Sequence, residues 1–438
     1  MKSMKTILLV TCIVLPAISP AAPVDVDALR AELRAANAAN DGTRVSAAAA
    51  ELRREFTGHP AYLYYAARGA ALSGDHEKAL RFLANVTARG VDMLAPVAND
   101  AAFEPVRALS GYSALLQQRD LLHAPAGQAA VAWSFGEPDT QPEAVALDSK
   151  GCVYIGSVQH GDIMVRDTNG DIRHWPAPGR WSVQGLHFSP DGKQLWAASS
   201  AMNVSRNADS ADHGRSALIA FDPGTGKVIA QHQLPESGEH VLGDFLFLDA
   251  DTVLATDSIG GGVYALDMRS GEFVQRVKPG TLRSPQGLAL LGGFVIIADY
   301  SNGLYRFDPV GETLLRIEDG PAAPYGIDGL YVHENAIIAI HNGVQPYQVN
   351  RYALSSDAAR IVSRETLLAN HPAFGEPTLG TVAGETLYLV ANSLWNHVTA
   401  EGTLPAAHLS VPVILSLDLS HTAVSSEQAE VGASAGRE

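Results

Sequence analysis

The sequence is poor in cysteine and in positive charge. Cys12 and Cys152 are the two cysteines among 438 residues, so a framework of several disulfides is excluded. Lysine and arginine number 31 against 47 aspartate and glutamate residues, which gives a formal net charge of −16. A surface this acidic repels nucleic acid and anionic lipid, so we expect neither as a partner. The charge is compatible with cation binding or with solubility alone.

Long apolar runs are also missing, and the longest candidate lies at the N-terminus. A basic start at Met1–Lys5 precedes an apolar run over Thr6–Leu15 and then small residues up to Ala22. This order is typical of a secretory signal peptide, and the run is too short to span a bilayer. We therefore expect residues 1–22 to be removed with Cys12, and the protein to be periplasmic or secreted. Cys152 would then have no partner, and its Cys-Val-Tyr-Ile context predicts a buried strand residue.

Residues 25–122 are predicted to form a helical domain. Alanine, leucine, arginine and glutamate recur at helical spacing, and turns such as Ser73–Asp75 separate the helices. Small residues at Ala67, Gly69 and Ala71 would let the helix after this turn approach closely. The segment resembles tetratricopeptide repeats in its paired helices and small crossing residues. Its functional interpretation is a peptide-binding or dimerising module that mediates protein contacts; the structural alternative is a small cap on the next domain.

The rest of the chain is built from a repeated unit of about 40 residues. Two clear copies lie between Ser284 and Tyr352, and each contains short runs rich in valine, isoleucine and tyrosine, separated by turn residues. Such a repeat predicts the blades of a β-propeller. The first strands of six units begin at spacings of 41, 60, 42, 42 and 50 residues, at Glu143, Gln184, Asp244, Gln286, Asp328 and Thr378.

The sequence therefore predicts a mainly β protein, with a six-bladed propeller over 129–419 preceded by the helical domain. A ring of blades must close or expose an edge. The last unit supplies three strands, and Ala129–Phe135 reads as a strand ahead of the first unit. We expect this N-terminal strand to complete the sixth blade. Residues 420–438 are small and polar, which predicts a disordered tail.

The first residues of the six inner strands are expected to meet at the mouth of the central channel. Three of the six are carboxylates (Glu143, Asp244, Asp328) and two are amides (Gln184, Gln286). Carboxylates pushed together repel, and a bound cation relieves the repulsion. Oxygen ligands favour Ca²⁺ or Mg²⁺, with Mn²⁺ or Zn²⁺ as alternatives. In the structural interpretation, some of these side chains only cap strand ends by bonding backbone N–H groups.

A second set of polar residues lies at the ends of the second strands. His341 occupies a slot in which two other units have aspartate, so it is a candidate for proton transfer, with a core histidine as the alternative. Extra length after Ser199 and after Asn392 predicts long loops at the same rim, where they would shape a pocket. Candidate substrate-binding residues are Trp181, Gln184, Asn392 and Trp395. The chain has no Gly-rich phosphate loop, no Ser-His-Asp signature and no paired-cysteine motif.

The units that begin Gln286-Gly-Leu and Asp328-Gly-Leu resemble the gluconolactonase / senescence marker protein / LRE-like family, with strictosidine synthase-like and NHL-repeat propellers as more distant relatives in pattern. This resemblance covers about residues 129–418. It implies a divalent cation in the channel, with Glu143 and Asp328 at the family's Glu and Asp ligands. Gln286 stands where the family usually has a ligating Asn, and Asp244 where a further Asn contacts metal or substrate.

Two functional hypotheses follow. In the first, the protein is a secreted, metal-dependent hydrolase of a lactone or similar ester, in which the cation polarises the carbonyl and Asp244 or His341 activates water. In the second, it is a non-catalytic propeller that binds a protein or small ligand at the channel mouth. The fold alone does not separate an enzyme from a binding protein.

Overall fold

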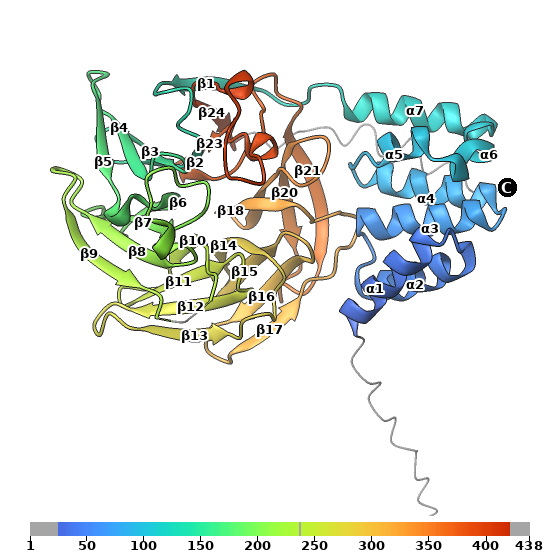
Figure 1. The fold of residues 1–438 in the computed structure, drawn as a ribbon, viewed down its shortest axis with the longest axis horizontal. Coiled ribbons are helices and arrows are strands. Elements are labelled where there is room, and N and C mark those ends of the chain that lie inside the picture. Colours follow the sequence, from blue (N-terminus) through green and yellow to red (C-terminus); the bar gives the residue numbers. More distant parts are fainter. Residues whose placement is uncertain (1–24, 236–237, 421–438) are drawn as a thin grey trace, which may run out of the picture.

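The structure is a computed structural model that describes residues 25–235 and 238–420. The predicted signal peptide and all but the first residue of the predicted tail lie outside the described residues. Figure 1 shows a layer of helices lying against one side of a ring of sheets. No described helix combines the length and the apolar composition needed to cross a membrane.

The helical layer begins with antiparallel helices whose starts are set by aspartate caps. Asp25, Asp41 and Asp75 each accept a hydrogen bond from a backbone N–H in the first turn. The spacing of the small residues suggested that Gly69 would face the helix that follows it. The structure places Gly69 against the preceding helix instead, where a Cβ would lie 2.5 Å from Ser46 Oγ. The helices are α1 (Val26–Ala38), α2 (Gly42–Glu55), α3 (Pro60–Leu72), α4 (His76–Ala88), α5 (Leu94–Asn99), α6 (Glu104–Arg107) and α7 (Ser110–Leu122).

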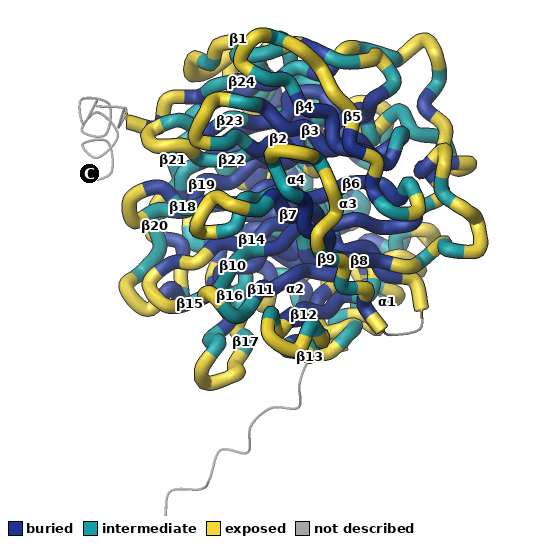
Figure 2. The backbone as a smooth tube through the Cα atoms, turned by 90° about the vertical axis from the view of Figure 1, so that its left-hand side faces the viewer, coloured by how far each residue is buried: buried dark blue, intermediate teal, exposed yellow. Residues whose placement is uncertain are grey.

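Six four-stranded antiparallel sheets form the propeller, which confirms the predicted fold class. Adjacent inner strands contact one another around the whole ring, and Figure 2 shows their buried backbone at its centre. In order from the channel outward, the first three blades are β2 (Pro142–Leu147), β3 (Val153–Ser157), β4 (Asp162–Arg166), β5 (Ile172–Pro176); β6 (Ser182–Phe188), β7 (Leu195–Ser200), β8 (Ser216–Phe221), β9 (Val228–Gln233); and β10 (Leu242–Phe247), β11 (Thr252–Asp257), β12 (Gly262–Asp267), β13 (Phe273–Val277). The last three are β14 (Pro285–Leu291), β15 (Phe294–Asp299), β16 (Gly303–Asp308), β17 (Thr313–Arg316); β18 (Ile327–His333), β19 (Ala336–His341), β20 (Gln348–Leu354), β21 (Ile361–Ala369); and β22 (Gly380–Ala383), β23 (Thr386–Val390), β24 (Val413–Asp418), β1 (Ala129–Ser134).

The ring is closed by strands from the two ends of the propeller. The first strand, β1, is the outermost strand of the sixth blade, as the sequence predicted, and it pairs with β24. The register places Ala129 opposite Leu417 and Ser134 opposite Val413. The N-terminal strand therefore covers an edge that would otherwise be exposed. Cys152 is only partly buried and lies one residue ahead of β3, so it is not a buried strand residue as expected.

The helices share a hydrophobic core with the fifth blade. Tyr325 and Ala323, which precede β18, are buried in one cluster with Phe56, Tyr62 and other helical residues. The ring of His59 stacks on Tyr62 at a centroid distance of 4.0 Å and lies 4.4 Å from Tyr325. This continuous core fixes the helical layer on the rim of the propeller.

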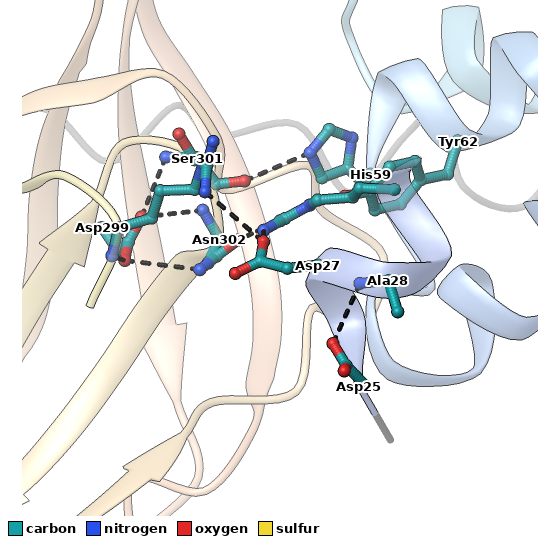
Figure 3. Close-up of polar contacts among 10 residues, drawn as sticks. Asp25, Asp27, Ala28, His59, Tyr62, Asp299, Ser301 and Asn302 are labelled. Carbon is teal, nitrogen blue, oxygen red and sulfur yellow. Dashed lines mark hydrogen bonds and ion pairs between the residues drawn. The ribbon is translucent and has the colours of Figure 1, made fainter. Parts of the chain in front are cut away.

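Polar contacts add to this interface, and Figure 3 shows several of them. His59 Nε2 lies 3.1 Å from the carbonyl oxygen of Ser301, and a guanidinium nitrogen of Arg30 donates to Asn302 Oδ1 at 2.6 Å. Burial lowers the pKa of His59 to about 3, so the imidazole is neutral and its Nε2–H donates. Asp299 shapes the same loop by accepting from the backbone N–H groups of Ser301 and Asn302.

Candidate active site at the channel mouth

The inner strands aim their polar residues into the channel through β-bulges. Five of the six inner strands have an irregular register at the polar position, for example between Pro142 and Val145 around Glu143, and between Ile327 and Leu330 around Asp328. A bulge bends its strand and redirects a side chain, which is why bulges occur beside functional sites. Repetition of this bulge around the ring brings residues far apart in the sequence to one place.

Glycines next to these positions let neighbouring inner strands approach. A Cβ at Gly287 would lie 2.5 Å from the backbone oxygen of Asp328 and 2.6 Å from the backbone nitrogen of Leu330. The Gln286-Gly-Leu pattern therefore has a structural basis, because only glycine fits where two strands converge on the channel.

One cavity of about 300 Å³ collects the polar residues of the channel mouth. Four carboxylates line it, and its lining contains no lysine, arginine or histidine. Gln184, Gln286, Met202 and Trp395 also line it, and the last two come from the long loops expected at this rim. The four carboxylates are Glu143, Asp244, Asp328 and Glu376.

Burial raises the pKa values of three of these acids, Asp328, Glu143 and Glu376, and for the first two the charges of neighbouring carboxylates add to the rise. The pKa of Asp328 rises to about 7, first because the carboxyl is buried, while a hydrogen bond from Asn342 opposes the rise and the charges of Glu376 and Asp244 add to it. Burial and then the charge of Asp328 raise the pKa of Glu143 well above its usual range. Burial also raises the pKa of Glu376. Asp328 and Glu143 therefore retain protons at pH values where a free carboxyl group is ionised, unless a positive charge binds beside them.

Three of the carboxylates have one oxygen fixed by a neighbour. Trp395 Nε1 donates to Glu143 Oε2 at 2.6 Å, and Asn342 Nδ2 donates to Asp328 Oδ2 at 2.7 Å. His187 Nε2 lies 2.7 Å from Asp244 Oδ1 and donates to it. Each side chain is thereby oriented through a single oxygen, and the other oxygen is left for a ligand.

The amide groups of the two glutamines already have hydrogen-bond partners within the protein. Gln286 Oε1 accepts from Ser258 Oγ at 3.1 Å, and its amide Nε2 donates to Ser284 Oγ at 3.1 Å. Gln184 Nε2 lies 3.2 Å from Met202 Sδ. Gln286 could give its amide oxygen to a cation only by sharing it with the Ser258 hydroxyl.

The second set of residues, at the ends of the second strands, does not line this cavity. Most of its members bond the loop that enters the inner strand of their own blade. Asp299 accepts from the backbone N–H of Arg283, and Ser157 Oγ donates to the carbonyl oxygen of Thr140. This ring of contacts holds each blade together, which is a structural role.

His341 belongs to that structural ring, and the structure does not bring it to the acidic cavity. Its Nδ1 lies 3.0 Å from the carbonyl oxygen of Tyr325 and donates to it, and its Nε2 accepts from Tyr352 Oη at 2.9 Å. Burial lowers its pKa to about 4. A neutral imidazole with both nitrogens engaged has no free position for transferring a proton to a substrate, so we do not retain His341 as a catalytic candidate.

Trp181 and Asn392 also lie away from the cavity. Trp181 is buried in the core between the first two blades, where its Nε1 donates to Asp212 Oδ2 at 3.2 Å. The Asn392 side chain bonds Ser410 Oγ and the backbone of Val411 and Val413. Both side chains organise loops, and of the four expected substrate-binding residues only Gln184 and Trp395 line the cavity.

The cavity residues that were not predicted include Glu376, Tyr300 and Asn342. Each follows a strand or precedes one in a loop, outside the repeated first-strand position. Glu376 lies two residues ahead of Thr378, and its carboxylate accepts from the backbone N–H of Asn396. Its proximity in sequence to the predicted Thr378 slot was the one available signal.

The donor chemistry of the cavity fits a hard divalent cation. The carboxylates of Glu143 and Asp328 and the amide oxygen of Gln286 are oxygen donors, and their setting lacks a cationic side chain. Among the residues that the structure describes, no group of three or more His, Cys, Asp or Glu side chains is arranged to hold a metal. A cation in this cavity would therefore be coordinated by the carboxylates of Glu143 and Asp328 and by neutral oxygen ligands such as the Gln286 amide.

These features define the protein as a six-bladed propeller with an acidic cavity at the channel mouth. No family model and no curated protein matches the chain. Similar solved structures include the PQQ-bound aldose sugar dehydrogenase of Streptomyces coelicolor, with 14% identity over 67% of this chain and 99% of that chain and a TM-score of 0.46. Regucalcin of Agrobacterium tumefaciens, described as a calcium-binding protein, has 14% identity over 65% and 93%, with a TM-score of 0.46. Virginiamycin B lyase of Staphylococcus aureus has 16% identity over 66% and 100%, with a TM-score of 0.43. At these values none of them carries an inference about activity or site.

Proposed function

We propose that this protein is a secreted hydrolase of a lactone or similar ester that uses a divalent cation, with Ca²⁺ as first choice. One observation supports this most: four carboxylates line a single cavity whose lining has no cationic side chain. Glu143 and Asp328 would hold the cation, with Gln286 as a neutral donor. Bound there, the cation would polarise the ester carbonyl and stabilise the developing oxyanion.

The chain's own residues supply orientation and proton transfer in this proposal. His187 holds Asp244 through Oδ1, so Oδ2 is the oxygen that would take a proton from an attacking water. The same proton would then pass to the leaving alkoxide. Trp395 fixes Glu143 through its indole N–H, and Asn342 fixes Asp328. Gln184 would contact the substrate from the wall of the cavity.

Metal analysis followed by kinetics tests the proposal. The purified protein is dialysed against chelator, supplied with Ca²⁺, Mg²⁺, Mn²⁺ or Zn²⁺, and screened against γ- and δ-lactones and aryl esters. We expect activity that depends on the cation, and its loss in Glu143→Gln and Asp328→Asn with folding intact. Stoichiometric metal retained by both variants would rule out the assigned ligands. Mass analysis of the mature protein tests removal of residues 1–22.

A non-catalytic binding protein is the second candidate, and one observation favours it. Among the described residues, no three acidic or histidine side chains are arranged as metal ligands. An acidic cavity of this kind could instead bind a small ligand through hydrogen-bond donors. A folded protein that binds no metal and hydrolyses none of the screened esters would favour this candidate over the hydrolase.

A further inference from the structure

A second and larger cavity lies between the helices and the propeller. Its volume is about 670 Å³, within the range of small-molecule sites. Much of its wall is apolar, and the helices and the propeller rim both contribute to it. Leu33, Tyr65 and Met93 come from the helical layer, and Val344 comes from the loop after β19.

This interdomain cavity adjoins the acidic cavity. Tyr300 and Asn342 line both of them, so these two side chains form a wall that the two spaces share. Gly343 lets the ring of Tyr300 lie against the loop after β19, because a Cβ there would be 2.5 Å from the ring carbon Cζ. The absence of a side chain at Gly343 therefore determines where the Tyr300 ring lies between the two cavities.

Asn342 has an unused hydrogen-bond acceptor at this junction. Its Nδ2 donates to Asp328 Oδ2, while its Oδ1 is buried and has no partner among the described residues. The residue is only 8% exposed, so bulk water does not readily satisfy this oxygen. A buried acceptor without a partner costs stability, and a ligand that brings an N–H or O–H group would remove that cost.

We propose that the interdomain cavity is the subsite for the remote part of the substrate, an apolar acyl chain or ring. The inference rests on the proposed function for the reacting end of the molecule. The substrate class is a lactone or ester with its carbonyl in the acidic cavity, a hydrogen-bond donor facing Asn342 Oδ1, and an apolar group between the helices and the rim.

Of the charged or titratable Arg, His and Asp side chains that line the interdomain cavity, Arg34 and Arg283 are exposed, and the other three are already bonded or neutral. Arg30 is already bonded to Tyr62 Oη and Asn302 Oδ1. Asp92 is paired with His123 at 2.8 Å. His59 is neutral, as its lowered pKa requires. The helical layer would thus select substrates by size and apolarity, and the blades would supply the reactive groups.

Calorimetric titration with two γ-lactams tests the subsite without any turnover. Each lactam carries an acylamino group, acetyl in one and octanoyl in the other, and the ring amide resists hydrolysis. Each buried methylene gains about fourfold in affinity, so three or more should make the octanoyl compound at least about sixtyfold tighter. Filling the cavity with Val344→Trp, or with Met93→Trp from the helical side, should abolish this preference.

A matched variant and a second replacement complete the experiment. Val362→Trp adds the same ring at an exposed valine on β21 that does not line the cavity, and should keep the preference. Asn342→Ala should weaken both lactams by a similar factor, about tenfold, because it removes the contact to the shared N–H. Equal affinity of the wild type for both lactams would overturn the subsite. Chain-length preference without ester hydrolysis would support the subsite and overturn the hydrolase.

Discussion

Replacing Asp328 with asparagine should stabilise the cation-free protein, and the gain should grow as the pH rises. Burial is the main reason why the pKa of Asp328 rises from 3.8 to about 7 in the folded protein. The folded state therefore keeps a proton that the unfolded state releases, and folding loses stability as the pH rises from about 4 to above 7. Asparagine has nearly the same shape, does not ionise, and can still accept from Asn342.

The size of the change in the free energy of unfolding follows from the shift in the pKa of Asp328. Roughly three pKa units correspond to at most about 4 kcal/mol at pH values above both pKa values. Between pH 5.5 and pH 8.5 the advantage of Asp328→Asn should increase by roughly 2 kcal/mol. Saturating Ca²⁺ should reverse the order at pH 8.5, because a cation that binds only the folded wild type adds stability by mass action.

Urea unfolding with chelator at pH 5.5, 7.0 and 8.5, and again with Ca²⁺, measures this directly. Asp191→Asn is the control, since hydrogen bonds from Ser189 and Lys193 lower the pKa of this exposed acid to about 2 and asparagine there should bring no gain. A variant less stable than wild type at pH 8.5 in chelator, or a difference independent of pH, would refute the electrostatic reasoning.

Three further changes probe the site and its support. Trp395→Phe removes the indole N–H that bonds Glu143 Oε2, so Ca²⁺ affinity by calorimetry should fall about tenfold, as expected for a hydrogen bond to a charged group; unchanged affinity would exclude Glu143 as a ligand. His187→Phe frees Asp244 Oδ1, so kcat should fall by roughly ten- to a hundredfold with Ca²⁺ affinity retained, and a loss of cation binding instead would place Asp244 among the ligands. Phe56→Ala empties part of the core shared by helices and propeller and should cost about 3–5 kcal/mol in urea unfolding, whereas a change below about 1 kcal/mol would mean that the interface contributes little.

The fold and the acidic ring were readable from the sequence because the repeat makes equivalent positions visible. A unit of about 42 residues fixes which residue opens each inner strand, and the ring then brings Glu143, Asp244 and Asp328 together without knowledge of any side-chain contact. The closure by β1 followed from the missing fourth strand of the last unit.

Residues outside the repeat could not be placed in this way. Glu376 reaches the cavity through a loop whose path depends on packing, and the interdomain cavity depends on how the helices sit on the rim. Ser258, Tyr300 and Asn342 stand at equivalent positions, one residue after the second strands β11, β15 and β19, so the repeat did contain a signal for them. His341 was correctly identified as a member of a repeated set at the ends of the second strands, but its role in that set was interpreted as proton transfer. That set bonds the entering loop of each blade, so a histidine there serves the backbone.

The repeat also separates what the fold requires from what a ligand requires. Equivalent inner positions hold Gln184 and Gln286, and Thr378 precedes the sixth inner strand and donates to the backbone oxygen of Glu143. The architecture therefore accepts neutral side chains at these positions, and three buried carboxylates are not needed to build it. Because such carboxylates destabilise the empty cavity, their charge is best explained by what enters it. A bound positive charge is therefore the central element of the proposed function, and the cavity under the helices would select the substrate.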